Sequence, residues 1–159
     1  MLTQKCEILF PLAGLESGLN TIGVMPKPGD AGMLEGIHVL IVEDDQDTLS
    51  IFGQYLAHLG ALVTMVRSAA EAIVSLQRVR ADVIIGDLAM PITDGLTFIR
   101  QVRRLPGEAD NPTPAIALTG YSGYQKRAID AGFQVYLMKP VDPLIVAKEV
   151  ARLADHRSG

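Results

Sequence analysis

A doubly wound α/β domain is the fold class that this 159-residue sequence predicts, over about residues 36–156. First, five short apolar runs alternate with five stretches whose apolar residues recur at helical spacing. Second, this alternation requires parallel strands, because each helix carries the chain back to the edge of the sheet from which it started. Third, Gly60 and Gly132 stand where two of the helices should end.

The expected strands alternate with the expected helices along the chain. The helical stretches surround Leu49–Leu59, Ala69–Leu76, Ile99–Val102, Gln125–Ala131 and Val146–Leu153, and the fourth of these has the weakest pattern. Three of the apolar runs are almost unbroken, as in strands covered on both faces, whereas "LVTMV" contains Thr64 and is more typical of an edge strand. The strands are expected at Ile37–Val42, Leu62–Val66, Val83–Ile85, Ala115–Leu118 and Val135–Met138.

Residues 1–35 differ from the rest and are predicted to be an N-terminal extension or linker. Positions 14–36 hold six glycines together with Pro26 and Pro28, and no strand or helix period persists there. The apolar run "EILFPL" at 7–12 is the exception and is interpreted as a short edge strand or a docking segment. Residues 157–159 are expected to form a tail after the last helix.

Composition excludes several classes of function. The net charge of −4 and the absence of a Lys/Arg cluster argue against a nucleic-acid-binding module. A single cysteine, Cys6, suits a reducing compartment, and no apolar run approaches the length of a membrane span. The run at 8–15 contains Pro11 and follows Glu7, which disfavours a secretion signal. We therefore expect a soluble, cytoplasmic protein without membrane contact.

Polar side chains follow four of the five predicted strands. Glu43 and Asp44 follow the first strand, Asp87 the third, Thr119 the fourth and Lys139 the fifth. Each alone has a structural explanation, since an Asp after a strand is often a helix cap and a Lys is usually solvated. Ligands of such sheets, however, bind beyond the carboxyl ends of the strands, so four polar strand ends at one edge predict a functional site.

The residue types limit the chemistry of this edge. Glu43, Asp44 and Asp87 would raise one another's pKa unless a cation neutralised them, and oxygen ligands of this kind suit Mg²⁺. His38, His58 and His156 are scattered, so no zinc site is expected.

The same residues could carry out phosphoryl transfer. Asp87 could then attack phosphorus and form an acyl phosphate, with Lys139 supplying positive charge and Thr119 a hydroxyl.

These residues resemble the receiver domain of two-component response regulators. The matching stretches are "VLIVEDD" (39–45), "DLAMPITDG" (87–95), "ALTGY" (117–121) and "YLMKP" (136–140), which occur in the family's order within residues 37–155. The resemblance implies a flavodoxin-like (βα)5 fold with strand order 2-1-3-4-5. It also implies a phosphoacceptor signalling domain rather than an enzyme, with at most slow self-dephosphorylation.

The resemblance assigns roles to the acidic residues. Asp87 corresponds to the phosphoacceptor, and Glu43 and Asp44 to the acidic pair that holds Mg²⁺, with the backbone carbonyl of Ala89 as a further ligand. Asp45 lies one place beyond the pair and is interpreted as a bystander. Asp47 is expected to be an N-cap or first-turn residue of the following helix.

The remaining site residues would act as a switch. Thr119 corresponds to the switch hydroxyl, Lys139 to the lysine that contacts the phosphoryl group, and Tyr136 to an aromatic whose ring turns inward; a half-buried edge-strand aromatic is the alternative for Tyr136. The Lys139–Pro140 bond is expected to be cis. Tyr121 is expected to overhang the site and limit the access of water, and Asp94-Gly95 to be turn residues in which the glycine supplies a positive φ.

The expected partner is a histidine kinase or a histidine phosphotransfer protein, and phosphorylation-dependent dimerisation is a further expectation. Only "DHRSG" follows the last helix, which favours either a stand-alone regulator or the receiver of a hybrid histidine kinase. The stretches 34–45 and 114–143 resemble hybrid-kinase receivers, and "EILFPLAG" (7–14) resembles the closing strand of a kinase ATP-binding domain. The hybrid origin is therefore favoured, with residues 13–36 as the linker.

Two other classes fit less well. An aspartate-nucleophile phosphatase would need a second acid two residues after Asp87, where Ala89 stands. A flavin or nucleotide binder would need a phosphate-cradling loop after the first strand, where "EDDQD" would repel phosphate.

Overall fold

The computed structural model of the chain describes residues 8–9 and 26–158 and confirms the doubly wound prediction. Five parallel strands lie in the order β3-β2-β4-β5-β6, which is the order 2-1-3-4-5 when they are counted along the domain. Their bounds are His38–Val42 (β2), Leu62–Val66 (β3), Val83–Asp87 (β4), Ala115–Thr119 (β5) and Val135–Met138 (β6).

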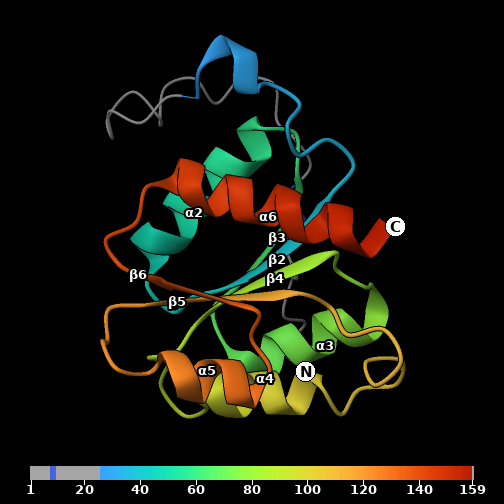
Figure 1. Ribbon diagram of the computed structural model, residues 1–159, viewed down its shortest axis with the longest axis vertical. Coiled ribbons are helices and arrows are strands. Elements are labelled where there is room, and N and C mark those ends of the chain that lie inside the picture. Colours follow the sequence, from blue (N-terminus) through green and yellow to red (C-terminus); the bar gives the residue numbers. More distant parts are fainter. Residues whose placement is uncertain (1–7, 10–25, 159) are drawn as a thin grey trace, which may run out of the picture.

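The helices cover both faces of this sheet (Figure 1). Helices α2 (Gln46–His58) and α6 (Pro143–Ser158) lie on one face. Helices α3 (Ala69–Arg78), α4 (Gly95–Val102) and α5 (Gln125–Ala131) lie on the other. Strand residues alternate between the two hydrophobic cores: Val39 and Ile41 belong to the core under α2 and α6, whereas Leu40 and Val42 belong to the other.

Helix ends follow the sequence signals. Gly60, with φ of 102°, and Gly132, with φ of 130°, end α2 and α5, because only glycine adopts these conformations without strain. The N-cap of α2 is Asp45, whose carboxylate accepts a hydrogen bond from the Thr48 amide at 2.8 Å. Asp45 is thus no bystander in the fold, while Asp47 lies in the first turn of α2, one of the two positions expected for it.

The sheet has a sixth strand, since Ile8–Leu9 (β1) pairs antiparallel with β3. It falls within the 7–12 run; the rest of that run lies outside the described residues. The expectation that "LVTMV" is the edge strand is therefore wrong for the described sheet, whose outermost strand on this side is β1. The polar side chain of Thr64 is buried in β3, and its hydroxyl oxygen has a hydrogen-bond partner in the Nε2 atom of His38, 2.8 Å away.

Residues on both sides of the predicted 36–156 domain contact it in the structure. Residues 26–36, expected within the linker, include a 3₁₀ turn at Pro28–Asp30 and fold against the domain. Leu34 is fully buried, and its amide donates to the Leu59 carbonyl at 3.0 Å. At the other end α6 runs to Ser158, and Arg157, expected in the tail, donates to the Ala81 carbonyl at 2.9 Å.

A buried carboxylate organises the long loop between α4 and β5. Glu108 accepts hydrogen bonds from Arg103 at 2.6 Å and from the amide and hydroxyl of Thr113 at 2.9 and 2.5 Å. Burial alone would raise the pKa of Glu108, but the Thr113 hydrogen bonds and the Arg103 charge outweigh it and lower that pKa. The Pro-rich loop is therefore fixed by an internal ion pair.

Gly86 lies within β4 and is buried. A Cβ at this position would lie 3.7 Å from the Phe98 and Phe133 rings, which is ordinary van der Waals contact.

Among residues 8–9 and 26–158, no helix has both the length and the apolar character needed to cross a bilayer.

Candidate functional site

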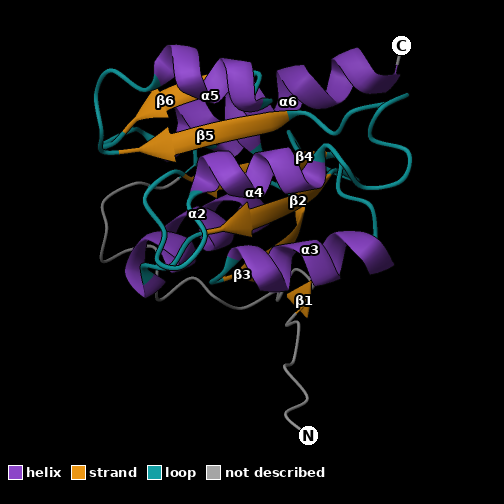
Figure 2. Cartoon of the chain, turned by 90° about the horizontal axis from the view of Figure 1, so that it is seen from below, coloured by secondary structure: helices purple, strands orange, loops and turns teal. Residues whose placement is uncertain are grey.

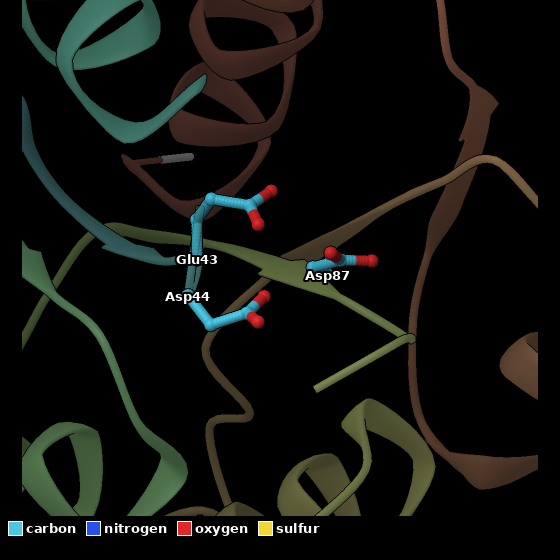
Figure 3. A group of neighbouring side chains, drawn as sticks. All are labelled: Glu43, Asp44 and Asp87. Atoms are coloured by element: carbon cyan, nitrogen blue, oxygen red, sulfur yellow. The ribbon is translucent and has the colours of Figure 1, made fainter. Parts of the chain in front are cut away.

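Three carboxylates converge at the carboxyl edge of the sheet (Figure 3). Glu43 and Asp44 follow β2 and Asp87 ends β4, and one carboxylate oxygen from each lies within 4.8 Å of the others. Strands β2 and β4 are parallel neighbours with Val42 opposite Gly86, so the two sequence-distant acidic stretches leave the sheet side by side. The structure thus brings together all three acids that the sequence singled out.

Lys139 is the cation of this cluster. Its Nζ atom lies 2.6 Å from Glu43 Oε2 and 3.3 Å from Asp87 Oδ2. The Lys139–Pro140 peptide bond is cis, as expected, and the Lys139 amide donates to the Thr119 carbonyl at 2.8 Å. The lysine is therefore held between two carboxylates by backbone contacts to the neighbouring strand.

The acids differ in their surroundings. Burial raises the pKa of Glu43 to about 7, although the Lys139 ammonium and the Asp45 amide act in the opposite direction. Burial would lower the pKa of Lys139, but the hydrogen bond to Glu43 and the charges of Asp87 and Glu43 outweigh it and raise that pKa. The lysine therefore stays charged, whereas Glu43 binds a proton more readily than a free carboxylate does.

Backbone amides orient two of the carboxylates. The Ala89 amide donates to Asp87 Oδ1 at 3.0 Å, and the Asp45 amide donates to Glu43 Oε1 at 3.1 Å. The other Asp87 oxygen is the one that faces Lys139. These two contacts hold the Asp87 carboxylate in one orientation. The residue is 6% exposed, so only a small area of it is open to solvent.

Arg67 was missed by the sequence interpretation. Its guanidinium donates to the Asp44 carbonyl at 2.9 and 3.3 Å, which fixes the backbone of the acidic loop. Arg67 directly follows β3, so a polar strand end was the available signal.

The predicted switch residues lie on β5 and β6. Thr119 is fully buried, and its hydroxyl oxygen accepts a hydrogen bond from the Tyr121 amide at 3.1 Å. The Tyr136 hydroxyl donates to the Tyr121 carbonyl, and its ring is half-buried. Both side chains therefore contact the same loop after β5. Tyr121 itself is 56% exposed.

The loop after Asp87 departs from expectation. The positive φ falls on Ile92, at 68°, rather than on Gly95, and the Thr93 amide donates to the Pro91 carbonyl at 2.8 Å across this turn. Gly95 is needed for a different reason: a Cβ there would lie 2.3 Å from the Asp87 carbonyl oxygen. Close backbone approach, not turn conformation, requires this glycine.

The donor set fits Mg²⁺. Glu43, Asp44 and Asp87 offer only oxygen, which is the ligand type that this small, hard cation prefers. The amide of Ala89 is committed to Asp87, and its carbonyl stays a predicted further ligand. Lys139 already neutralises part of the charge, which leaves an acidic cluster that still attracts a cation.

Comparison with known proteins assigns the family. The response regulator receiver domain family matches residues 39–151. The chain belongs to this family, which is the class that the sheet order and the acidic edge define.

Several relatives share the domain. An uncharacterised 14.6 kDa protein of Leptolyngbya boryana is 43% identical over 70% of this chain and 85% of its own length. The transcriptional regulatory protein PrrA of Mycobacterium tuberculosis is 33% identical over 72% of this chain, and hybrid signal transduction histidine kinase D of Dictyostelium discoideum is 28% identical over 77%. The chain spans only 47% and 8% of the lengths of these two proteins.

Solved structures have the same fold. The chemotaxis response regulator CheY4 of Vibrio cholerae has a TM-score of 0.68 at 28% identity, covering 74% of this chain and 98% of its own. The receiver domain of a sensor histidine kinase from Pseudomonas aeruginosa, with a magnesium ion in its active site cleft, has a TM-score of 0.64 at 28% identity. That match covers 76% of this chain and 98% of the Pseudomonas chain.

Proposed function

We propose that Asp87 accepts a phosphoryl group from the phosphohistidine of a histidine kinase or phosphotransfer protein. The observation that carries this proposal is the pairing of buried Asp87 with Lys139 beside two further acids at the open edge of the sheet. A carboxylate ion-paired to a lysine for structure alone would not need two more carboxylates within 4.8 Å. Their mutual repulsion is a cost that a bound cation offsets.

In the transfer, an oxygen of Asp87 forms a bond to phosphorus while the bond from phosphorus to the donor imidazole nitrogen breaks. The donor nitrogen keeps the electron pair, and Asp87 becomes an acyl phosphate. The Ala89 amide holds one Asp87 oxygen, which orients the carboxylate for in-line attack. Lys139, 3.3 Å from the other oxygen, compensates the charge of the incoming phosphoryl group.

Glu43, Asp44 and Asp87, with the carbonyl of Ala89, would hold Mg²⁺. The ion would supply charge compensation for the phosphoryl oxygens. Arg67 supports this role because it holds the Asp44 backbone in place.

Phosphorylation would be transmitted through the loop after β5. Thr119 is the hydroxyl donor available at the end of β5, and its oxygen is engaged by the Tyr121 amide. When Thr119 moves to the phosphoryl group, this hydrogen bond breaks and the Tyr121 carbonyl that Tyr136 contacts moves with the loop. Thr119 and Tyr136 therefore form a two-state element that the acyl phosphate biases.

On this proposal the chain is a phosphoacceptor with at most slow self-dephosphorylation, and any kinase activity resides outside it. Two settings have support. Similarity to hybrid kinases, including the Dictyostelium protein, supports the receiver of a hybrid histidine kinase. The small Leptolyngbya protein, 85% of which this chain covers, supports a stand-alone regulator that acts by docking. The coding sequence upstream of Met1 decides between them.

The direct test is incubation with acetyl phosphate and MgCl₂ followed by intact mass spectrometry. We expect one phosphoryl adduct on the wild type, which is lost after EDTA and in Asp87→Asn. Circular dichroism of Asp87→Asn controls for folding. A wild-type chain that stays unmodified while a known receiver domain is labelled in parallel would contradict the proposal.

A further inference from the structure

The backbone of the phosphoacceptor touches the first residue of α4. A Cβ built on Gly95 would lie 2.3 Å from the Asp87 carbonyl oxygen and 2.7 Å from the Leu88 Cα. Ordinary contacts begin near 3.4 Å, so the Asp87 carbonyl would have to move by about 1 Å to admit even a methyl group. The neighbouring atoms are backbone atoms, which no side-chain rotation can move away.

The helix cannot yield easily to such a group. The Gly95 amide donates to the Leu88 carbonyl at 3.1 Å, and Asp94 caps the helix by accepting from the Thr97 amide at 2.8 Å. Leu96 and Phe98 then enter the hydrophobic core, with Phe98 fully buried. Because α4 is fixed at its cap and along its buried face, strain at Gly95 falls on the strand end that carries Asp87.

We propose that Gly95 is a positioning residue for the phosphoacceptor: its missing side chain lets the start of α4 rest directly on the Asp87–Leu88 backbone. This contact fixes where the Asp87 carboxylate stands relative to Glu43, Asp44 and Lys139. The inference rests on the proposed function of Asp87. The positive φ of the loop after Asp87 belongs to Ile92, so the turn itself does not require a glycine at position 95. The close approach to the Asp87–Leu88 backbone is the feature that does.

The test compares Gly95→Ala with a matched control, Gly53→Ala. A Cβ on Gly53 would also be too close to a neighbour, 2.1 Å from Met65 Sδ, but that atom belongs to a flexible side chain that packs between α2 and β3. Both variants should lower the midpoint of thermal unfolding. In Gly95→Ala alone, the dissociation constant for Mg²⁺, measured by calorimetry, should rise about tenfold or more, as for changes in the residues that orient metal ligands.

A second measurement needs neither metal nor phosphodonor. The backbone amide chemical shifts of Asp87, Leu88 and Ala89 in the metal-free protein should change in Gly95→Ala and stay as in the wild type in Gly53→Ala. Unchanged shifts together with an Mg²⁺ dissociation constant within twofold of wild type would overturn the inference. A wild type that takes no phosphoryl group would instead contradict the proposed function, and the shift comparison would still test the contact.

If Gly95→Ala does not fold, variants of the cap test the same contact. Asp94→Ala removes the group that starts α4 at Gly95, whereas Asp94→Asn keeps a capping oxygen and loses the same charge. We expect weaker Mg²⁺ binding in Asp94→Ala than in Asp94→Asn. Equal affinities in the two variants would count against positioning by the start of α4.

Discussion

Binding of Mg²⁺ should depend on pH through Glu43. Burial raises the pKa of this carboxyl from 4.5 to about 7, and a carboxylate must lose its proton before it binds a metal. One unit below a pKa of about 7, only about one carboxyl in eleven is ionised, whereas one unit above it about ten in eleven are. The dissociation constant should therefore fall about tenfold between about pH 6 and pH 8 and then level off.

In the metal-free protein, rising pH should lower the stability of the fold, although it favours Mg²⁺ binding. The folded state holds the Glu43 proton more tightly than the unfolded chain does, so this group makes the fold less stable as pH rises from 4.5 through about 7. Lys139 does not contribute in this window, because its pKa is raised from an already high value. Added Mg²⁺ should reverse the trend by binding the ionised form.

The assay is calorimetric titration with MgCl₂ across this pH range at constant ionic strength, in two buffers of different ionisation enthalpy to count released protons. Glu43→Gln is the matched control, because it keeps the shape but cannot titrate. It should bind Mg²⁺ more weakly and without the pH step. A dissociation constant that is flat in the wild type, or a step that persists in Glu43→Gln, would refute the reasoning.

Three further changes test other parts of the structure. Gly86→Ala should raise the free energy of unfolding in urea by about 0.5–1 kcal/mol, because the methyl group fits beside two aromatic rings and the unfolded chain loses freedom; a lower stability would show that β4 has no room there. Glu108→Gln should lower the free energy of unfolding by about 1.5–3 kcal/mol, because the charge-assisted hydrogen bond with Arg103 is lost. Since the pKa of Glu108 is lowered in the folded state, this wild-type advantage is present at neutral pH and disappears as pH falls through the acid range. Equal urea midpoints at neutral pH would contradict this. Tyr121→Ala should speed the loss of phosphate from Asp87 in a mass-spectrometric time course, whereas an unchanged rate would rule out shielding by this ring.

Much of the fold and the site could be predicted because each follows from local pattern. The strands and helices are visible in the period of apolar residues, and parallel pairing then brings the strand ends to one edge. Glu43, Asp87 and Lys139 are each ordinary in sequence, and only this shared edge makes them a cluster. The Lys139–Pro140 conformation came from family resemblance rather than from the residues.

What was missed depends on contacts that sequence does not reveal. Leu34 stands among glycines and prolines, yet it packs into the core, because burial depends on what surrounds a residue and not on its neighbours along the chain. Glu108 lies in a Pro-rich loop that resembles a solvated turn, and its partner Arg103 became visible only in the fold. Gly95 was assigned a turn role because glycine has two uses, and only coordinates distinguish close approach from positive φ.

Strands β1 and β6 lie at opposite borders of the sheet (Figure 2). Strand β1 forms one border of the sheet and β6, which carries Tyr136, forms the other, with four strands between them. At about 4.8 Å per strand, the two borders lie roughly 24 Å apart. A partner that binds along β6 therefore does not compete with the chain at β1 for one sheet edge. On the proposed function, a partner docked along β6 near Tyr136 would leave the pairing of β1 with β3 intact.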